Sequence, residues 1–234
     1  MTVVGVCSYA YPMKLYNYFR SSASFRVRIA LNLKGLAYEY VPVHIAKGDH
    51  KREPYATLAA DTLVPMLETD DGARLSQSMA IIEYLDELHP TPPLLPADAL
   101  GRAQVRALAQ MVACEMHPPT NLRVLKYLTN ELAQDDEHKS AWYHHWCRGG
   151  LEAFERQLQA LAESRARRGL APSIYCYGDS LTLADCCLLP QIYNAQRFAV
   201  PLDGLPLTMA AHEAGLATPA AQKAHPSACP DSQP

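Results

Sequence analysis

The stretch YNYFRSSASFRVRIALNLKG, residues 16–35, joins a strand to a helix through a turn rich in small hydroxyl side chains. Lys14 to Tyr18 is typical of a β-strand, and the apolar spacing from Ser24 to Lys34 predicts a helix that Gly35 ends. Serines at such a turn ordinarily cap the helix by accepting a backbone N–H. The same hydroxyls lie at the positive end of a helix, where they are also suited to an anion. Both roles are open at this point.

The segments that follow the turn complete the pattern of a small α/β domain. The predicted elements are strands at 38–44 and 66–68, a hairpin turn at 70–72, a return strand at 74–75 and a helix at 78–88. The predicted order is therefore strand, helix, three strands, helix. This is the order of a thioredoxin-like domain.

A proline-dense breaker, HPTPPLLPADALG at residues 89–101, separates this part from a second one. Beyond it the apolar spacing predicts helices at 102–129, 140–165, 183–193 and 207–215. We therefore expect an α/β thioredoxin-like N-terminal domain followed by an all-α C-terminal domain. The expected boundaries are an extension at 1–12, the first domain at 13–90, a linker at 91–101 and the helical domain at 102–234. The tail from 223 to 234 is expected to be loosely held.

One helix start in the second part carries a clear local signal. In GDSLTLADCCLL, residues 178–189, Thr182 and Asp185 form a T-x-x-D variant of the capping box. Leu181 and Cys186 stand where a hydrophobic staple would close. We interpret this segment as a folding device with no part in chemistry.

The composition argues against several classes of protein. The chain has 234 residues, is 49% hydrophobic and carries a net charge of −3 with both signs interspersed. The chain therefore lacks the excess positive charge that would attract nucleic acid or an anionic membrane. No apolar run approaches the roughly 18–20 residues that cross a bilayer, and residues 1–12 lack the features of a secretory signal. We expect a cytoplasmic protein.

Seven cysteines include one vicinal pair but no C-x-x-C motif. This pattern argues against a disulfide framework or a zinc site, and we expect no metal. Cys114, Cys186 and Cys187 lie in apolar helical patterns and are predicted to be small core residues.

Three motifs together resemble one known family. They are FRSSASFRVRIAL at 19–31, LVP at 63–65 followed by Gln77–Ser78, and GDSLTLADCCLLPQIYNAQRF at 178–198. The ordered set, spread from Met13 to about Pro230, resembles the zeta class of the glutathione transferase superfamily, whose members include maleylacetoacetate and maleylpyruvate isomerases. The resemblance implies a glutathione transferase architecture, in which the N-terminal domain binds glutathione and the helical domain completes a pocket for the electrophile.

The chain departs from the usual zeta pattern at several positions. Ala23 replaces a cysteine of the signature, Phe25 replaces a tryptophan, and Ala59–Ala60 stand where the family commonly has Asn-Pro. Maleylpyruvate-type members also lack that cysteine, so its loss is compatible with isomerisation. It excludes a mechanism through a protein thiol at this position.

The resemblance assigns glutathione to residues from both parts of the chain. Hydroxyls and amides at the start of the first helix would stabilise its thiolate, with Arg20 or Arg26 adding to the effect. Val64, before a proline that resembles the family's cis-proline, would pair with the cysteinyl backbone, and a helix start at Gln77 would receive the γ-glutamyl carboxylate. The implied glutathione-binding residues are Ser21, Ser22, Ser24, His50, Val64, Gln77, Ser78, His117 and Asn121.

Three arginines indicate the class of substrate. By resemblance, Arg20, Arg123 and Arg197 border the electrophile pocket and act in catalysis together with Ser21 and Ser22. Planar guanidiniums bind carboxylates through two parallel hydrogen bonds, so they suit a dicarboxylic keto acid.

We therefore expect a glutathione-dependent cis–trans isomerase of maleyl-type keto acids in aromatic breakdown, with maleylacetoacetate as first choice and maleylpyruvate as the alternative. A broad glutathione S-transferase and a non-catalytic interaction module are the further alternatives. The resemblance also implies a homodimer.

Overall fold

A four-stranded mixed sheet forms the base of the protein in the computed structural model, which describes residues 13–232. Its strand order is β2-β1-β3-β4. β1 (Lys14–Asn17) pairs in parallel with β2 (Glu39–Pro42) and antiparallel with β3 (Met66–Glu68). β3 then pairs antiparallel with β4 (Arg74–Ser76). Parallel strands need a crossover connection, and the predicted helix between β1 and β2 supplies it.

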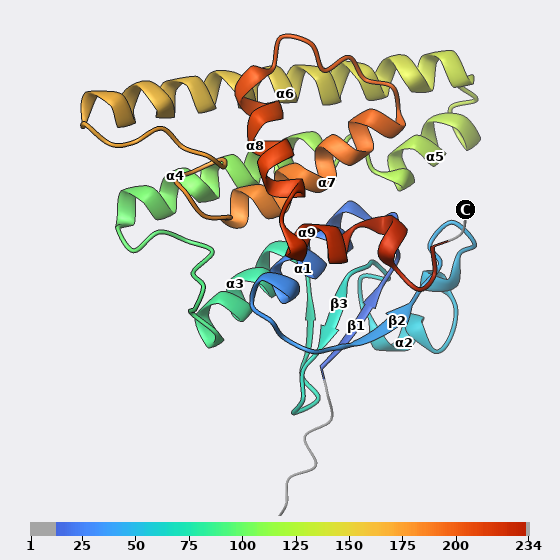
Figure 1. Cartoon of the computed structure of the whole chain (residues 1–234). Coiled ribbons are helices and arrows are strands. Elements are labelled where there is room, and N and C mark those ends of the chain that lie inside the picture. The colour runs from blue at the N-terminus through green and yellow to red at the C-terminus, as the bar shows by residue number, and fades with distance from the viewer. Residues whose placement is uncertain (1–12, 233–234) are drawn as a thin grey trace, which may run out of the picture.

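Helix α1 (Ser22–Leu33) lies between the sheet and the helical half of the molecule (Figure 1). It packs against α3 (Ser78–Leu88), α7 (Leu183–Arg197) and α9 (Pro219–Ala224). Because it has neighbours on several sides, it buries its polar as well as its apolar residues. The predicted thioredoxin-like order of the first part is confirmed.

The remaining elements are mostly helices, and Figure 1 shows α4 to α8 stacked above the sheet. Their bounds are η1 (Asp49–Lys51), α2 (Tyr55–Leu58), α4 (Ala99–Gln110), the π-helical η2 (Met111–Met116), α5 (Leu122–Asn130), α6 (Asp136–Arg167), α8 (Pro206–Leu216) and η3 (Pro226–Ala228). None of the described helices is both long and apolar enough to cross a bilayer. The helix-rich remainder agrees with the predicted fold class.

The single helix expected over 102–129 is wrong. The chain leaves the helix after η2 and begins again at α5, with Asn121 as the cap. Pro118 and Pro119 explain the break, because proline lacks the N–H that a continuing helix would use. The domain boundaries at 90 and 102 stay a prediction, and the extension expected at 1–12 lies outside the described residues.

The expectation of a loose tail is also wrong for the described residues. α9 returns beside α1, where the Ala224 carbonyl accepts a hydrogen bond from Arg28 Nε at 2.9 Å. Further on, Asp231 accepts hydrogen bonds from the Phe19 N–H and the Tyr40 hydroxyl. The tail is therefore tied to the sheet half by polar contacts, which hydropathy alone does not reveal.

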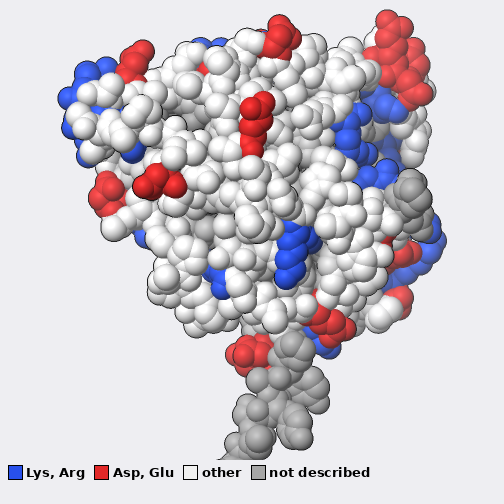
Figure 2. Space-filling view, in the orientation of Figure 1, with Lys and Arg blue, Asp and Glu red and all other residues white. Residues whose placement is uncertain are grey.

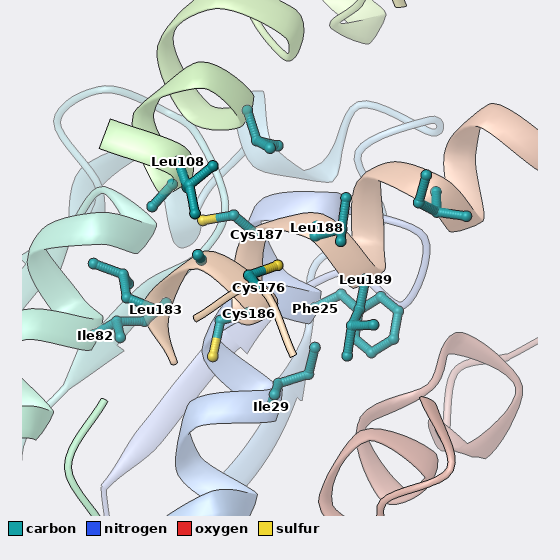
Figure 3. Packing of buried hydrophobic residues seen from close by; sticks show 14 of the residues in the cluster. Phe25, Ile29, Ile82, Leu108, Cys176, Leu183, Cys186, Cys187, Leu188 and Leu189 are labelled. Atoms are coloured by element: carbon teal, nitrogen blue, oxygen red, sulfur yellow. The ribbon is translucent and has the colours of Figure 1, made fainter. Parts of the chain in front are cut away.

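The shared core runs through both halves and is centred on α7 (Figure 3). Cys186 and Cys187 are fully buried there, as predicted, and Figure 3 shows the Cys187 side chain beside Leu108 of α4. Cys114 is exposed instead, because Val112 and Met116 take the buried positions of η2 and the residue between them faces outward.

The predicted capping box at the start of α7 forms. The Asp185 carboxylate accepts hydrogen bonds from the N–H and the hydroxyl of Thr182, both at 2.8 Å, and from the Cys176 N–H at 2.9 Å. Leu181 is buried beside it, as a hydrophobic staple requires. The segment holds the start of α7 against the loop before it, in agreement with a folding role.

Candidate active site

Ser21 caps helix α1 and keeps a free hydroxyl proton. Its backbone is extended, and its Oγ accepts a hydrogen bond from the Ser24 N–H at 3.2 Å. Ser21 is therefore the residue that caps α1. Because the cap uses only a lone pair of Oγ, the O–H of this half-buried residue can still donate to an anion.

Ser22 is almost fully buried and connects the sheet half to α7. Its Oγ accepts a hydrogen bond from Asn194 Nδ2, and Asn194 Oδ1 accepts one from Arg197 Nη1 at 3.2 Å. Two predicted site residues are thus joined through a third. Asn194 was not predicted from the sequence, although it lies one helical turn before Arg197 and so shares its face of α7.

Ser24 lies beneath the surface of the turn. It has no exposed area, and its hydroxyl has no hydrogen-bond partner among residues 13–232. It does not present that hydroxyl to a ligand at the surface. We therefore leave Ser24 out of the glutathione contacts proposed below.

The loop before β3 and the start of α3 carry two unusual backbone conformations. The Val64–Pro65 peptide bond is cis, as expected. Gln77, the residue before α3, has a φ of 68°, in the left-handed region that an L side chain rarely adopts. Such strain costs about 1–3 kcal/mol and is found mainly at binding and catalytic sites. Nothing in the sequence around Gln77 indicated it.

Ser78 is the first residue of α3 and contacts the buried guanidinium of Arg26. It is 5% exposed, and its Oγ accepts a hydrogen bond from Arg26 Nη1 at 3.2 Å. Arg26 thus reaches the start of α3, although the sequence suggested that it would support the hydroxyls at 21–24. It comes from α1, so the two helices meet through this pair.

His117 and Asn121 form a second polar pair above α1. Asn121 Nδ2 lies 3.2 Å from His117 Nε2, and Asn121 Oδ1 accepts the Arg123 N–H as the cap of α5. Burial of the ring, with the charges of Arg26 and Arg123 nearby, lowers the pKa of His117 to about 3. The imidazole is therefore neutral near pH 7.

The three predicted pocket arginines are exposed and lack acidic partners. None of the ion pairs among residues 13–232 involves Arg20, Arg123 or Arg197. The guanidinium carbon of Arg20 lies 4.8 Å from the centre of the Phe19 ring, and that of Arg197 lies 5.7 Å from the centre of the Phe198 ring. These contacts leave the guanidinium protons available to an anion.

Basic side chains also gather where α5 faces the loop that carries η1. Burial lowers the pKa of His50, and the charges of Lys51 and of Lys126 on α5 lower it further. Figure 2 shows Lys and Arg side chains in a recess on this side of the molecule. The recess therefore carries positive charge from both halves of the molecule.

The structure brings together some of the predicted residues more directly than others. Ser22 and Arg197 are linked through Asn194, and Ser78 lies on Arg26, whose charge reaches His117. No described hydrogen bond joins His50 or the Val64 backbone to either group.

The other cavities and clusters lie elsewhere. A cavity of about 350 Å³ beside Tyr38 and Cys229 is lined by none of the predicted residues. The same holds for a groove of about 530 Å³ that Leu128, Trp142 and Trp146 help to line. Over residues 13–232, no three His, Cys, Asp or Glu side chains are placed to share a metal ion.

Comparisons with known proteins show which family the chain is similar to. Residues 11–87 match the family model for the glutathione S-transferase N-terminal domain. The chain is 47% identical to a maleylpyruvate isomerase of a Ralstonia species, over 94% of this chain and all of that protein. It resembles the holo structure of a bacterial maleylpyruvate isomerase described as a zeta-class glutathione S-transferase, with a TM-score of 0.87 and 45% identity over 94% of this chain and 100% of that one.

A second solved structure is a maleylacetoacetate isomerase from Anaeromyxobacter dehalogenans with glutathione bound in its active site. It has a TM-score of 0.82 and 38% identity, and the match covers 95% of this chain and 98% of that one. Both kinds of isomerase are thus similar to this chain over nearly its whole length.

Proposed function

Because this chain belongs to the zeta class of the glutathione S-transferase family, we propose that it is a glutathione-dependent cis–trans isomerase of maleyl-type keto acids. The similar proteins are named for maleylpyruvate in some cases and for maleylacetoacetate in others. The proposal is therefore the class of substrate. Maleylacetoacetate as first choice stays a prediction.

The residues at the start of α1 and α3 fit glutathione. Within residues 13–232, two nitrogens of the buried Arg26 guanidinium have no hydrogen-bond partner, and the third donates to Ser78, the first residue of α3. Ser21, with a free hydroxyl proton at the positive end of α1, is the residue that we assign to the thiolate. The further residues that would hold the tripeptide are Val64, Gln77, Ser78, His50, His117 and Asn121. Ser22, beside Ser21 in the turn, is linked through Asn194 to Arg197 on the substrate side.

The strength of these groups is sufficient to activate a thiol. A free thiol has a pKa of about 8.5, and lowering it by about two units requires about 2.7 kcal/mol. A helix N-terminus contributes about 0.3–1 kcal/mol, and a hydrogen bond to an anion contributes about 1.5–3 kcal/mol. Ser21 and α1 together reach the required value, so no general base is needed.

Bound glutathione supplies a thiolate that adds reversibly to the cis double bond, which becomes a single bond, rotates, and re-forms as trans when the thiolate leaves. Arg20, Arg123 and Arg197 are the residues that we assign to the substrate. Their guanidiniums bind the carboxylates and stabilise the negative charge that passes to the keto oxygen. The protein's own residues move no proton in this scheme.

One observation carries the substrate assignment. Arg197 has no acidic partner among residues 13–232, yet Asn194 joins it to Ser22 at the start of α1. A cation that is free for a carboxylate is thus connected to the hydroxyl turn of the sheet half. A pocket for apolar electrophiles would gain little from this arrangement.

Isomerisation of maleylacetoacetate and maleylpyruvate, each with and without glutathione, tests the proposal. Formation of the trans product only with glutathione is expected for at least one of the two acids. Equal rates without glutathione would contradict it. Conjugation of chloro-aromatic electrophiles without activity on either acid would support the broad-transferase alternative, and failure to bind immobilised glutathione would support a non-catalytic module.

Two further properties belong to the same proposal. The protein is expected to form a homodimer and to work in the cytoplasm, in the breakdown of aromatic compounds. Analytical ultracentrifugation tests the first point directly. A monomer at micromolar concentration would contradict it.

A further inference from the structure

Arg26 is a buried cation for which the described part of the chain provides no anion. The residue is 3% exposed, and no ion pair among residues 13–232 includes it. Its Nη1 donates to Ser78 Oγ at 3.2 Å, whereas Nε and Nη2 have no hydrogen-bond partner in the described part of the chain. A buried charge without a partner is costly, so its retention calls for an explanation.

Arg28, two residues along the same helix, shows how this fold satisfies a structural arginine. It is 1% exposed, and its guanidinium donates to the Ala224 and Phe19 carbonyls and to Asn17 Oδ1, each at 2.9 Å. Both arginines are thus buried on the same helix, but within residues 13–232 only the Arg28 guanidinium has hydrogen-bond acceptors for all its nitrogens. The open hydrogen-bonding capacity of Arg26 is therefore specific to its position beneath α3.

The contact with Ser78 also fixes the direction of that hydroxyl. A guanidinium can only donate, so Ser78 Oγ must accept from Arg26, and its own proton is left to donate elsewhere. Ser78 is the first residue of α3, an eleven-residue helix whose first N–H groups have no partner within the helix. Gln77 precedes it with a φ of 68°. Hydroxyl, amides and helix dipole all favour an anion at this helix start.

We propose that Arg26 is a positioning residue for a ligand carboxylate, the γ-glutamyl carboxylate of glutathione, which it stabilises through Ser78. The assignment rests on the proposed function, because it takes glutathione as the ligand. Arg26 supplies positive charge from below and holds the Ser78 hydroxyl as a donor. Among residues 13–232 two guanidinium nitrogens of Arg26 have no hydrogen-bond partner, and the bound carboxylate would provide the counter-charge.

Calorimetric titration with two peptides tests the assignment. One is glutathione, and the other is γ-aminobutyryl-cysteinyl-glycine, which lacks only the γ-glutamyl carboxylate. The variants are Arg26→Met, which removes the charge at similar length, and Arg26→Lys, which keeps it. Arg156→Met, at an exposed position of α6, is the control for net charge.

Arg26→Met is expected to weaken glutathione binding about 10- to 100-fold and binding of the decarboxylated peptide less than about threefold. Arg26→Lys is expected to give an intermediate loss for glutathione, and Arg156→Met none. Thermal unfolding without ligand supplies a separate readout. Because Arg26→Met removes an unpaired buried charge, its apo melting temperature should equal or exceed that of the wild type, while its glutathione-induced rise should shrink.

Equal losses for the two peptides would overturn the assignment, because Arg26 would then serve the fold alone. Unchanged glutathione binding by Arg26→Met would overturn it as well. If Arg26→Met does not fold, the Arg26→Lys titration decides the assignment, and equal losses for the two peptides in that variant would overturn it. Failure of the wild type to bind either peptide would refute the proposed function itself, a pattern distinct from the others.

Discussion

Asn194→Ala removes the side chain that joins Ser22 of α1 to Arg197 of α7 in the candidate site. Asn194 donates to Ser22 Oγ and accepts from Arg197 Nη1 at 3.2 Å. A hydrogen bond to a charged group is worth about 1.5–3 kcal/mol and a neutral one about 0.5–1.5 kcal/mol. Because Arg197 is exposed, the lower end applies to its bond.

The expected result is a fall in kcat/KM for the maleyl acid of about 10- to 100-fold, or about 1.4–2.7 kcal/mol. Glutathione affinity should change less than about threefold, since Ser21 keeps its own cap. Steady-state kinetics with saturating glutathione measure the first quantity, and titration calorimetry measures the second. Gln196→Ala, an exposed neighbour on α7, is the matched control and should leave both unchanged.

A double-mutant cycle with Arg197→Ala decides whether the residue acts through the arginine. If Asn194 orients Arg197, Asn194→Ala should lower kcat/KM little further in a protein that already carries Arg197→Ala, because both substitutions remove the same interaction. Strictly additive losses would refute this reasoning. A large loss of glutathione affinity in Asn194→Ala would do so too, because it would place the effect at the start of α1.

Ser21→Ala should raise the pKa of the bound glutathione thiol by about one unit or more, because it removes the donor to the thiolate; thiolate absorbance against pH measures this, and an unchanged pKa would assign activation to another group. Arg197→Ala should cut isomerisation at least tenfold while glutathione affinity stays within about threefold; parallel losses in kinetics and calorimetry would place Arg197 outside the substrate pocket. Burial lowers the pKa of His212 to about 4, whereas an unfolded histidine titrates near about 6.5. The unfolded chain therefore binds this proton first, so the free energy of unfolding should fall as the pH drops from about 6.5 to about 4, by up to about 1.4 kcal/mol per pH unit. Chemical denaturation of the wild type and His212→Gln between about pH 7 and pH 5 compares the two slopes, and identical slopes would show that His212 is not the cause.

The features that short-range patterns determine were predicted well. β3 at 66–68 and α3 at 78–88 match the predicted bounds, because turn residues and apolar spacing mark both ends. The capping box of Thr182 and Asp185 likewise forms as predicted, because its two partners lie within four consecutive residues. The prediction of one helix over 102–129 failed at Pro118–Pro119. The apolar spacing continues there, but the two prolines prevent the backbone from continuing the helix.

The features that depend on distant contacts were not accessible from the pattern. Asn194 matters because α7 passes the start of α1, 172 residues earlier in the chain. The open hydrogen-bonding groups of Arg26 appear only once α3 and α7 enclose it, whereas Arg28 looks equivalent in the sequence. The tail is ordered by Asp231 contacts with Phe19 and Tyr40, which no local periodicity encodes.

In the proposed isomerisation, glutathione is returned unchanged after each turnover. Proton NMR can follow a maleyl acid incubated with the protein and a tenfold smaller amount of glutathione. We predict complete conversion to the trans acid while the free glutathione signal stays constant. Conversion that stops after one equivalent, with a glutathione conjugate as the product, would contradict the account.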